Sequence, residues 1–207
     1  GVPISVRTTE YDIRRGGVFG DVGTKILFND LTVGGWYESN AFRQARRFYG
    51  LDNRTASTRS SLVFQTNPFA TQWDFNYLTE TYQYYVQDKI ELRALTIDLG
   101  WKGFQVNNKA TPVVSGGLAA GKIKATDWFQ PHAGAVYKLS ANAELFGDFS
   151  EVTRAYVGSA TTGPFATTQA GFDALQAANN LKPETSDTWE LGGRFRNRWL
   201  NALLAEI

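Results

Sequence analysis

Apolar and polar side chains alternate with a period of two along most of this chain. That period is typical of β-strands, because successive side chains of a strand point to opposite faces of its sheet. Residues 95–105 show it most clearly. One set of positions there is apolar and the other polar or small: Leu95, Ile97, Leu99 and Trp101 against Thr96, Asp98, Gly100 and Lys102.

Similar segments recur often enough to predict about eight to ten strands. They cover residues 2–13, 18–28, 31–38, 61–66, 81–87, 95–105, 131–139, 143–149 and 185–196, with a further strand beginning near Trp199. Segments of about ten residues are long enough to cross a bilayer as tilted strands. The pattern therefore predicts an all-β, antiparallel fold and is compatible with a membrane barrel.

The predicted connections alternate between short and long. The short ones are residues 29–30, 88–94, 140–142 and 197–198, and the long polar ones are 42–61, 107–127 and 151–182. Outer-membrane barrels have short turns at one end and long loops at the other. Long structureless loops are uncommon in compact soluble domains. The alternation of short and long connections therefore favours a transmembrane barrel over a soluble sandwich. Within the last long connection, the Ala-rich residues 169–180 predict a short helix.

Composition supports this interpretation and removes several alternatives. The formal net charge is only +1, so no basic excess indicates a nucleic-acid partner. The chain has no cysteine, which excludes disulfides and thiolate sites, and 14% of its residues are aromatic. Its mean hydropathy of −0.31 suits strands that are apolar on one face only. No apolar run approaches the roughly 18 residues of a membrane-spanning helix.

The size and the two ends of the chain suggest a segment of a larger barrel. Residues 1–207 form one predicted unit, which begins at Gly1 without a methionine and stops at Ile207 shortly after a strand has begun. At roughly 20 residues per strand and connection, the chain holds about half of a transporter barrel of about 22 strands. We expect such an open piece to aggregate alone through its unpaired edges.

Three stretches carry a resemblance to TonB-dependent outer-membrane receptors. Residues 181–192, LKPETSDTWELG, are similar to the family's L-x-P-E-x-S-x-x-x-E-x-G stretch, where an outer loop re-enters the barrel. Residues 131–156 resemble the preceding hairpin and keep Arg154-Ala155 of its final segment. Residues 81–101 resemble a hairpin with the pattern Tyr-x-x-Tyr-x-Gln-Asp, which begins here at Tyr82.

The resemblance implies a bacterial outer-membrane receptor that takes up a scarce nutrient, such as an iron chelate or cobalamin. Its partners would be outer-membrane lipid, lipopolysaccharide, a small-molecule ligand and, through a plug domain, TonB. The sequence departs from the family in having no plug, no TonB-contacting segment and no closing strand that ends in an aromatic residue. No cofactor, metal or enzymatic activity is expected.

Other functions remain open. A small self-contained barrel could act as a passive pore, an adhesin or a structural protein. A soluble carbohydrate-binding β-sandwich would need the faces carrying Tyr82, Leu99 and Tyr137 to be buried in a core. An outer-membrane enzyme is the weakest alternative, because the polar residues form no identifiable acid–base pair.

Two motifs suggest chemistry that their surroundings do not support. Residues 116–122 have the glycine and lysine spacing of a phosphate-binding loop, but Ile123 stands where that loop needs Ser or Thr. We interpret the segment as an outer loop. His132 is the only histidine and has no Asp or Ser at a spacing that indicates a triad.

The candidate ligand-binding residues are basic and aromatic. Arg43, Arg46 and Arg47, with Arg54, Phe48 and Tyr49 nearby, predict a basic, aromatic loop that is a candidate for capture of an anionic ligand by charge and stacking. A loop that grips acidic lipopolysaccharide, or a simply solvated loop, is favoured over ligand capture. Interfacial girdles explain most of the aromatic residues near predicted strand ends: Trp36, Tyr37, Trp73, Tyr77, Trp101, Trp128 and Trp199. Trp36 and Tyr85 are the best candidates for stacking residues inside the lumen.

Overall fold

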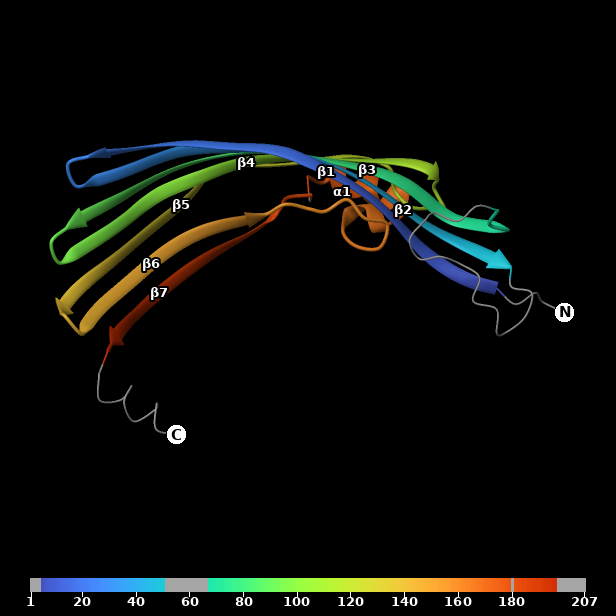
Figure 1. Cartoon of the computed structure of the whole chain (residues 1–207). Helices are drawn as coiled ribbons and strands as arrows, with labels where there is room; N and C mark the ends of the chain where they lie inside the picture. Colours follow the sequence, from blue (N-terminus) through green and yellow to red (C-terminus); the bar gives the residue numbers. More distant parts are fainter. Residues whose placement is uncertain (1–4, 51–66, 180, 197–207) are drawn as a thin grey trace.

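The computed structural model describes residues 5–50, 67–179 and 181–196. Seven strands among them form one antiparallel sheet, in which neighbouring strands are consecutive in the chain. The strands are β1 (Ser5–Ile26), β2 (Asn29–Gly50), β3 (Ala70–Leu92), β4 (Leu95–Val114), β5 (Gly121–Ser140), β6 (Ala143–Arg154) and β7 (Glu184–Phe195). A 3₁₀ turn, η1 (Pro164–Ala166), and a helix, α1 (Gln169–Ala177), lie between β6 and β7. Figure 1 shows the sheet as an open arch, with α1 beneath its concave side.

Tight turns join the strands at one end of the arch. Each turn has two residues, and the two strands that it joins are paired as far as the residues next to the turn. The turns are residues 27–28, 93–94 and 141–142. The first turn was predicted at residues 29–30, which instead open β2 as the partners of Lys25 and Ile26. The longer connections follow β2, β4 and β6 in the chain, so the predicted alternation of short and long connections is confirmed.

The strands are longer than the predicted ones. Two predicted segments, 2–13 and 18–28, belong largely to the single strand β1, and the predicted loop 107–127 shrinks to residues 115–120. The predicted loop 42–61 is strand as far as Gly50. In these outer halves both faces carry polar side chains, such as Asn107 and Asn108, so the period of two fades. The predicted strand 61–66 and the one near Trp199 lie outside the described residues.

The register separates a convex apolar face from a concave polar face. Partners across neighbouring strands point to the same side of a sheet. One convex row is Leu31, Asp88, Leu99, Ala133, Phe149 and Trp189. The next row toward the turns is Ile26, Asn29, Ile90, Ile97, Ala135, Gly147 and Leu191. Large apolar side chains stay exposed on this face, among them Leu99 at 44% and Leu191 at 89%.

Polar pairs join the strands on the concave face. Asp98 accepts hydrogen bonds from the Gln87 amide and lies 2.9 Å from Nε2 of His132. Glu144 pairs with Arg194, and Glu38 with Arg15. The faces of residues 95–105 therefore separate as the sequence predicts.

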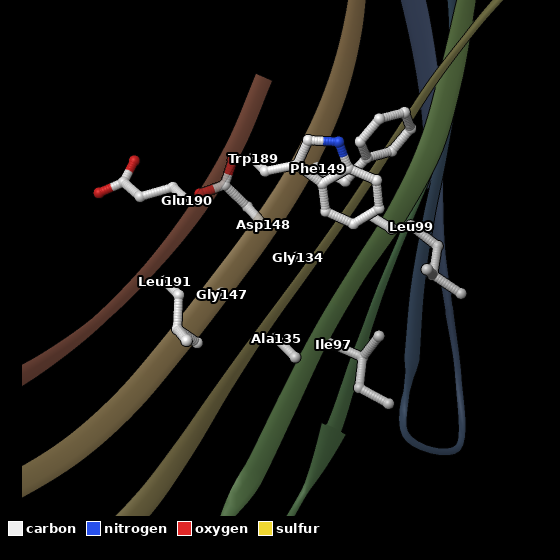
Figure 2. A pocket seen from close by; sticks show the side chains of 11 residues that line it. Ile97, Leu99, Gly134, Ala135, Gly147, Asp148, Phe149, Trp189, Glu190 and Leu191 are labelled. Atoms are coloured by element: carbon white, nitrogen blue, oxygen red, sulfur yellow. The ribbon is translucent and has the colours of Figure 1, made fainter. Parts of the chain in front are cut away.

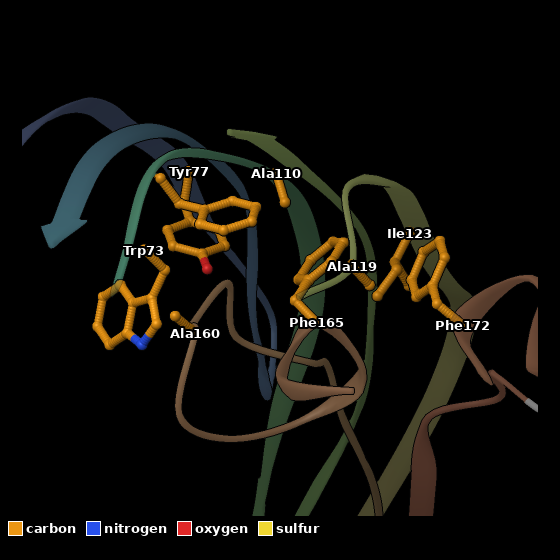
Figure 3. Close-up of a cluster of buried hydrophobic side chains, with 9 residues drawn as sticks. Trp73, Tyr77, Ala110, Ala119, Ile123, Ala160, Phe165 and Phe172 are labelled. Carbon is orange, nitrogen blue, oxygen red and sulfur yellow. The ribbon is translucent and has the colours of Figure 1, made fainter. Parts of the chain in front are cut away.

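The connection between β6 and β7 covers the outer part of the concave face. Phe165 and Phe172, from the connection, are fully buried against Tyr77 of β3 and Ile123 of β5 (Figure 3). The Thr168 hydroxyl accepts a hydrogen bond from the amide of Gly171, which caps α1. The predicted helix at residues 169–180 is confirmed, and the loop that contains it is a docked element.

No helix among the described residues is long and apolar enough to span a membrane.

Candidate functional site

Aromatic side chains gather on the concave face toward the turn end of β1–β3. Trp36 of β2 is the register partner of Phe19 on β1, and Tyr85 of β3 lies diagonally next to Trp36. The ring of Tyr85 lies over Gly34, where a Cβ would approach the ring within 2.6 Å or less. The Tyr85 hydroxyl donates to Asp21 Oδ2 over 3.2 Å. The structure thus brings Trp36 and Tyr85 together and adds Phe19, 64% exposed, which the sequence analysis did not select.

Arg46 lies on the same face but far from Phe19, Trp36 and Tyr85. It is ten residues beyond Trp36 in β2, about 33 Å at roughly 3.3 Å per residue. Its guanidinium carbon stands 5.0 Å from the centre of the Trp73 ring. Among the described residues, its Nε has no hydrogen-bond partner although it is buried. Arg46 is therefore positioned by stacking at the outer end of the concave face.

The other predicted basic residues face the opposite way. Arg43, Arg47 and Tyr49 project from the convex side of β2 and meet Glu10 and Asp74. Arg43 binds Asp74 through Nε at 3.0 Å and Nη2 at 2.7 Å. Arg47 bridges the two acids at 3.0 and 2.7 Å, and the Tyr49 hydroxyl donates to Glu10 at 2.6 Å. These contacts join the outer ends of β1, β2 and β3.

Asp74 is the centre of this cluster and has a perturbed pKa. Burial of its carboxylate, 3% exposed, acts to raise the pKa. The hydrogen bonds and charges of Arg43 and Arg47 outweigh burial, so the pKa of Asp74 lies below its ordinary value. The carboxylate is thus held in its charged form by two arginines.

The predicted capture loop is therefore wrong as a structural element. Arg43, Arg46, Arg47 and Tyr49 lie in β2, and alternation places Arg46 on one face and the other three on the other. Arg54 lies outside the described residues. Ligand capture by the four residues in β2 stays a prediction.

The girdle stays a prediction, and the structure places only some of the aromatic residues on the face that it requires. Tyr37, Trp101 and Trp128 lie on the convex face, where Tyr37 packs on Tyr82 and Trp128 stacks on Tyr84. Trp36, Trp73 and Tyr77 point to the concave face, so a membrane girdle does not explain them. Trp199 lies outside the described residues.

The two weak motifs gain no chemistry from the structure. Residues 116–120 lie in the connection between β4 and β5, and Gly121 and Lys122 begin the strand β5, whereas a phosphate-binding loop leads into a helix. Ser150 is opposite His132 in the register, but no hydrogen bond between described residues joins them. The Nε2 atom of His132 is occupied by Asp98.

A shallow groove of about 570 Å³ lies on the convex face of β4–β7. Its floor is made of small residues, including Ala133, Ala135 and Gly147. Figure 2 shows Phe149 and Trp189 together on one side of this floor and Ile97 and Leu99 on the other. The groove is apolar and lies on the face opposite Trp36, Tyr85 and Arg46, so it does not extend their site.

The architecture now has a counterpart among known proteins. The model of the family described as "TonB dependent receptor-like, beta-barrel" matches residues 5–205. The chain belongs to this family. The expected resemblance is thereby confirmed, and so is the antiparallel barrel fold, although the described strands form an unclosed sheet. No curated protein matches the chain.

Solved structures agree with this membership. The ferric citrate transporter FecA in its unliganded form is 18% identical, with a TM-score of 0.66 over 96% of this chain. The alcaligin outer-membrane receptor FauA from Bordetella pertussis is 15% identical, with a TM-score of 0.53 over 91%. A P. aeruginosa FpvA structure gives 14% identity and 0.53 over 91%. The chain spans 27%, 27% and 23% of these proteins, so the likeness shows the fold alone.

Proposed function

We propose that this chain is part of the barrel wall of a bacterial outer-membrane receptor that imports a scarce nutrient, such as an iron chelate or cobalamin. The family match over residues 5–205 carries this proposal. The two faces of the sheet support it: an apolar convex face suits lipid, and a polar concave face suits a wet lumen. FecA is a ferric citrate transporter and FauA an alcaligin receptor, which favours an iron chelate as the ligand class.

In this proposal the ligand moves along the concave face. Arg46 would attract an anionic chelate at the outer end, and Phe19, Trp36 and Tyr85 would offer flat surfaces for stacking further in. Arg43, Arg47 and Tyr49 would contribute mainly through the stability of the outer end, because Glu10 and Asp74 already balance the two arginines. TonB would act through a plug that this chain does not include. No enzymatic activity is proposed.

An uptake assay tests the proposal. The natural full-length protein is returned to a strain that lacks its gene, and accumulation of a radioactive label is measured for a panel of ferric chelates and for cobalamin. We expect energy-dependent uptake of at least one chelate. Changing both Trp36 and Tyr85 to Ala should weaken ligand binding roughly 30-fold, because each stacked aromatic side chain contributes about 1 kcal/mol.

Two residues on the convex face provide the matched control. Tyr82→Ala with Trp101→Ala removes the same amount of aromatic surface from the opposite side of the sheet and should leave ligand affinity unchanged. Uptake that persists after the proton gradient is collapsed would instead indicate a passive pore. Absence of uptake for every chelate and for cobalamin would contradict the proposal.

A further inference from the structure

Two buried amide side chains of the sheet hold the backbone of the connection between β6 and β7. Gln44 of β2 accepts a hydrogen bond of 2.8 Å from the amide of Ala160. Asn108 of β4 donates one of 2.7 Å to the carbonyl of Tyr156. Both side chains are only 2% exposed. The connection is therefore fastened to two strands at their concave face, and we call its residues 155–179 the ledge.

The ledge is also joined to the short connection between β4 and β5. The amide of Ala119 donates to the carbonyl of Thr167 over 2.9 Å. The Gln169 side chain both accepts from and donates to the backbone of Ala120, over 2.8 and 3.1 Å. The buried aromatic cluster of Figure 3 lies between these contacts and the sheet. Undocking would leave buried polar groups unpaired and expose apolar rings, so the docked state is strongly favoured.

The ledge covers the outer concave face unevenly. Phe75 of β3 is 0% exposed and Val106 of β4 is 7% exposed, whereas Tyr11 and Ile13 of β1 are 57% and 62% exposed. Tyr11 stacks on Phe42 of the same face, with ring centres 5.7 Å apart. Among the described residues, the outer part of β1 thus stays uncovered on its concave side. We call this part, which carries Tyr11 and Ile13, the β1 strip.

From these observations we propose that the ledge is a fixed part of the barrel wall, and that it confines a ligand to the β1 strip. The inference rests on the proposed function, which supplies a ligand that moves along the concave face. Such a ligand would contact Tyr11 and Ile13 first and then reach Phe19, which lies on the same face of the same strand. The ledge would limit the size of the ligand and would not open to admit it.

A reversible cross-link tests whether the ledge stays docked during uptake. Leu118, between β4 and β5, and Thr168 of the ledge are partners in an isolated antiparallel bridge. The Cα atoms of such partners lie about 4.5–5.5 Å apart, which suits a disulfide. The 207 residues contain no cysteine, so Leu118→Cys with Thr168→Cys introduces one defined pair. The full-length protein with both changes is assayed, oxidised and then reduced, with the best-transported compound of the uptake panel.

The two states of the cross-link distinguish a fixed ledge from a gate. A fixed ledge predicts that oxidation changes uptake less than about twofold. A gate that must open would lose uptake roughly tenfold or more on oxidation and regain it on reduction, and this result would overturn the inference. The two single-cysteine variants control for the substitutions, including loss of the Thr168 hydroxyl that caps α1.

Two positions of β1 provide a matched test of the β1 strip. Ile13 is 62% exposed on the concave face, and Val18 is 67% exposed on the convex face. Each is changed to Cys in the purified full-length protein and labelled with a bulky maleimide in detergent. The label at Ile13 should weaken binding of the same compound roughly tenfold or more, and the label at Val18 should leave binding unchanged. Equal binding after labelling at either position would overturn the confinement of the ligand.

Amide hydrogen exchange separates this inference from the proposed function, because it needs no ligand. Gln44→Ala removes the acceptor of the Ala160 amide and should speed its exchange about tenfold. Gln87→Ala is the matched control, since it removes a hydrogen-bonded glutamine of the same face whose partner is Asp98, and exchange at Ala160 should not change. Uptake with exchange at Ala160 as fast as that of an exposed amide would overturn the ledge alone. Slow exchange there without any uptake by the unaltered protein would contradict the proposed function.

Discussion

Changing Phe172 to Ala should release the docked connection from the concave face. Phe172 is 1% exposed and stacks on Phe165 with ring centres 5.4 Å apart. Replacing a buried phenylalanine with alanine typically costs 3–5 kcal/mol, because contacts are lost and a cavity remains. The connection is a local element, so most of this cost should lower its opening free energy, and about 3 kcal/mol increases the open population roughly 150-fold.

Amide hydrogen exchange across α1 in the full-length protein measures this effect. Leu175→Ala is the matched control, since Leu175 lies in the same helix but is 36% exposed, and its loss should cost about 1 kcal/mol or less. We expect fast exchange in α1 for Phe172→Ala only, with unchanged exchange in β1 and β2. Equal exchange in both variants, or no change in either, would refute the packing argument.

Two further predictions concern the outer ends of the strands. Asp74→Asn removes the shared partner of Arg43 and Arg47 and should lower the free energy of unfolding by about 3 kcal/mol at pH 7, as measured by denaturant titration. The pKa of Asp74 is lowered in the folded protein, so its contribution to the free energy of unfolding is fully present above the ordinary pKa of about 3.9. That contribution is lost as pH falls through the lowered pKa. The difference in stability between the variant and the unaltered protein should therefore shrink in acid. Tyr77→Phe should be neutral or stabilise the fold by up to about 1 kcal/mol, because the buried Tyr77 hydroxyl has no hydrogen-bond partner among the described residues. A fall of more than about 2 kcal/mol in the free energy of unfolding, in the same titration, would contradict this expectation.

The alternation of residues was sufficient to predict the inner half of the sheet. In residues 95–105 one face is apolar and the other polar, so the sequence itself distinguishes the two environments. Beyond the convex-face residues Trp101 and Trp128 both faces of the sheet are polar. Asn107, Asn108 and Lys109 therefore show no alternation of apolar and polar side chains. The pattern therefore predicts a loop for the outer half of β4, which instead pairs in register with β3 and β5.

The same limitation explains the assignment of the arginines. Once β2 is known to extend to Gly50, alternation alone separates Arg46 from Arg43 and Arg47. Asp74, the partner of Arg43 and Arg47, is 31 residues from Arg43 along the chain, and no local sequence pattern indicates that contact. Trp36 and Tyr85 could be selected from the sequence because both lie in the inner half, where the two faces are distinguishable.

The docking of the last connection could be predicted only in part. The Ala-rich composition predicts α1, but burial of Phe165 and Phe172 depends on Tyr77 and Ile123 from distant strands. A helix that forms in a loop and a helix that covers a sheet have similar local sequences. Tertiary contacts decide between them.

Site-directed spin labelling tests the central claim, that the convex face meets lipid and the concave face meets water. Nitroxides are placed at Leu95, Ile97 and Leu99 on one face of β4, and at Asp98 and Lys102 on the other, in the full-length protein in outer-membrane vesicles. The account predicts that labels at the first three sites collide with oxygen dissolved in lipid and that labels at the last two collide with a water-soluble nickel complex. Labels at Leu95, Ile97 and Leu99 that report a dry protein core, reached by neither reagent, would contradict it.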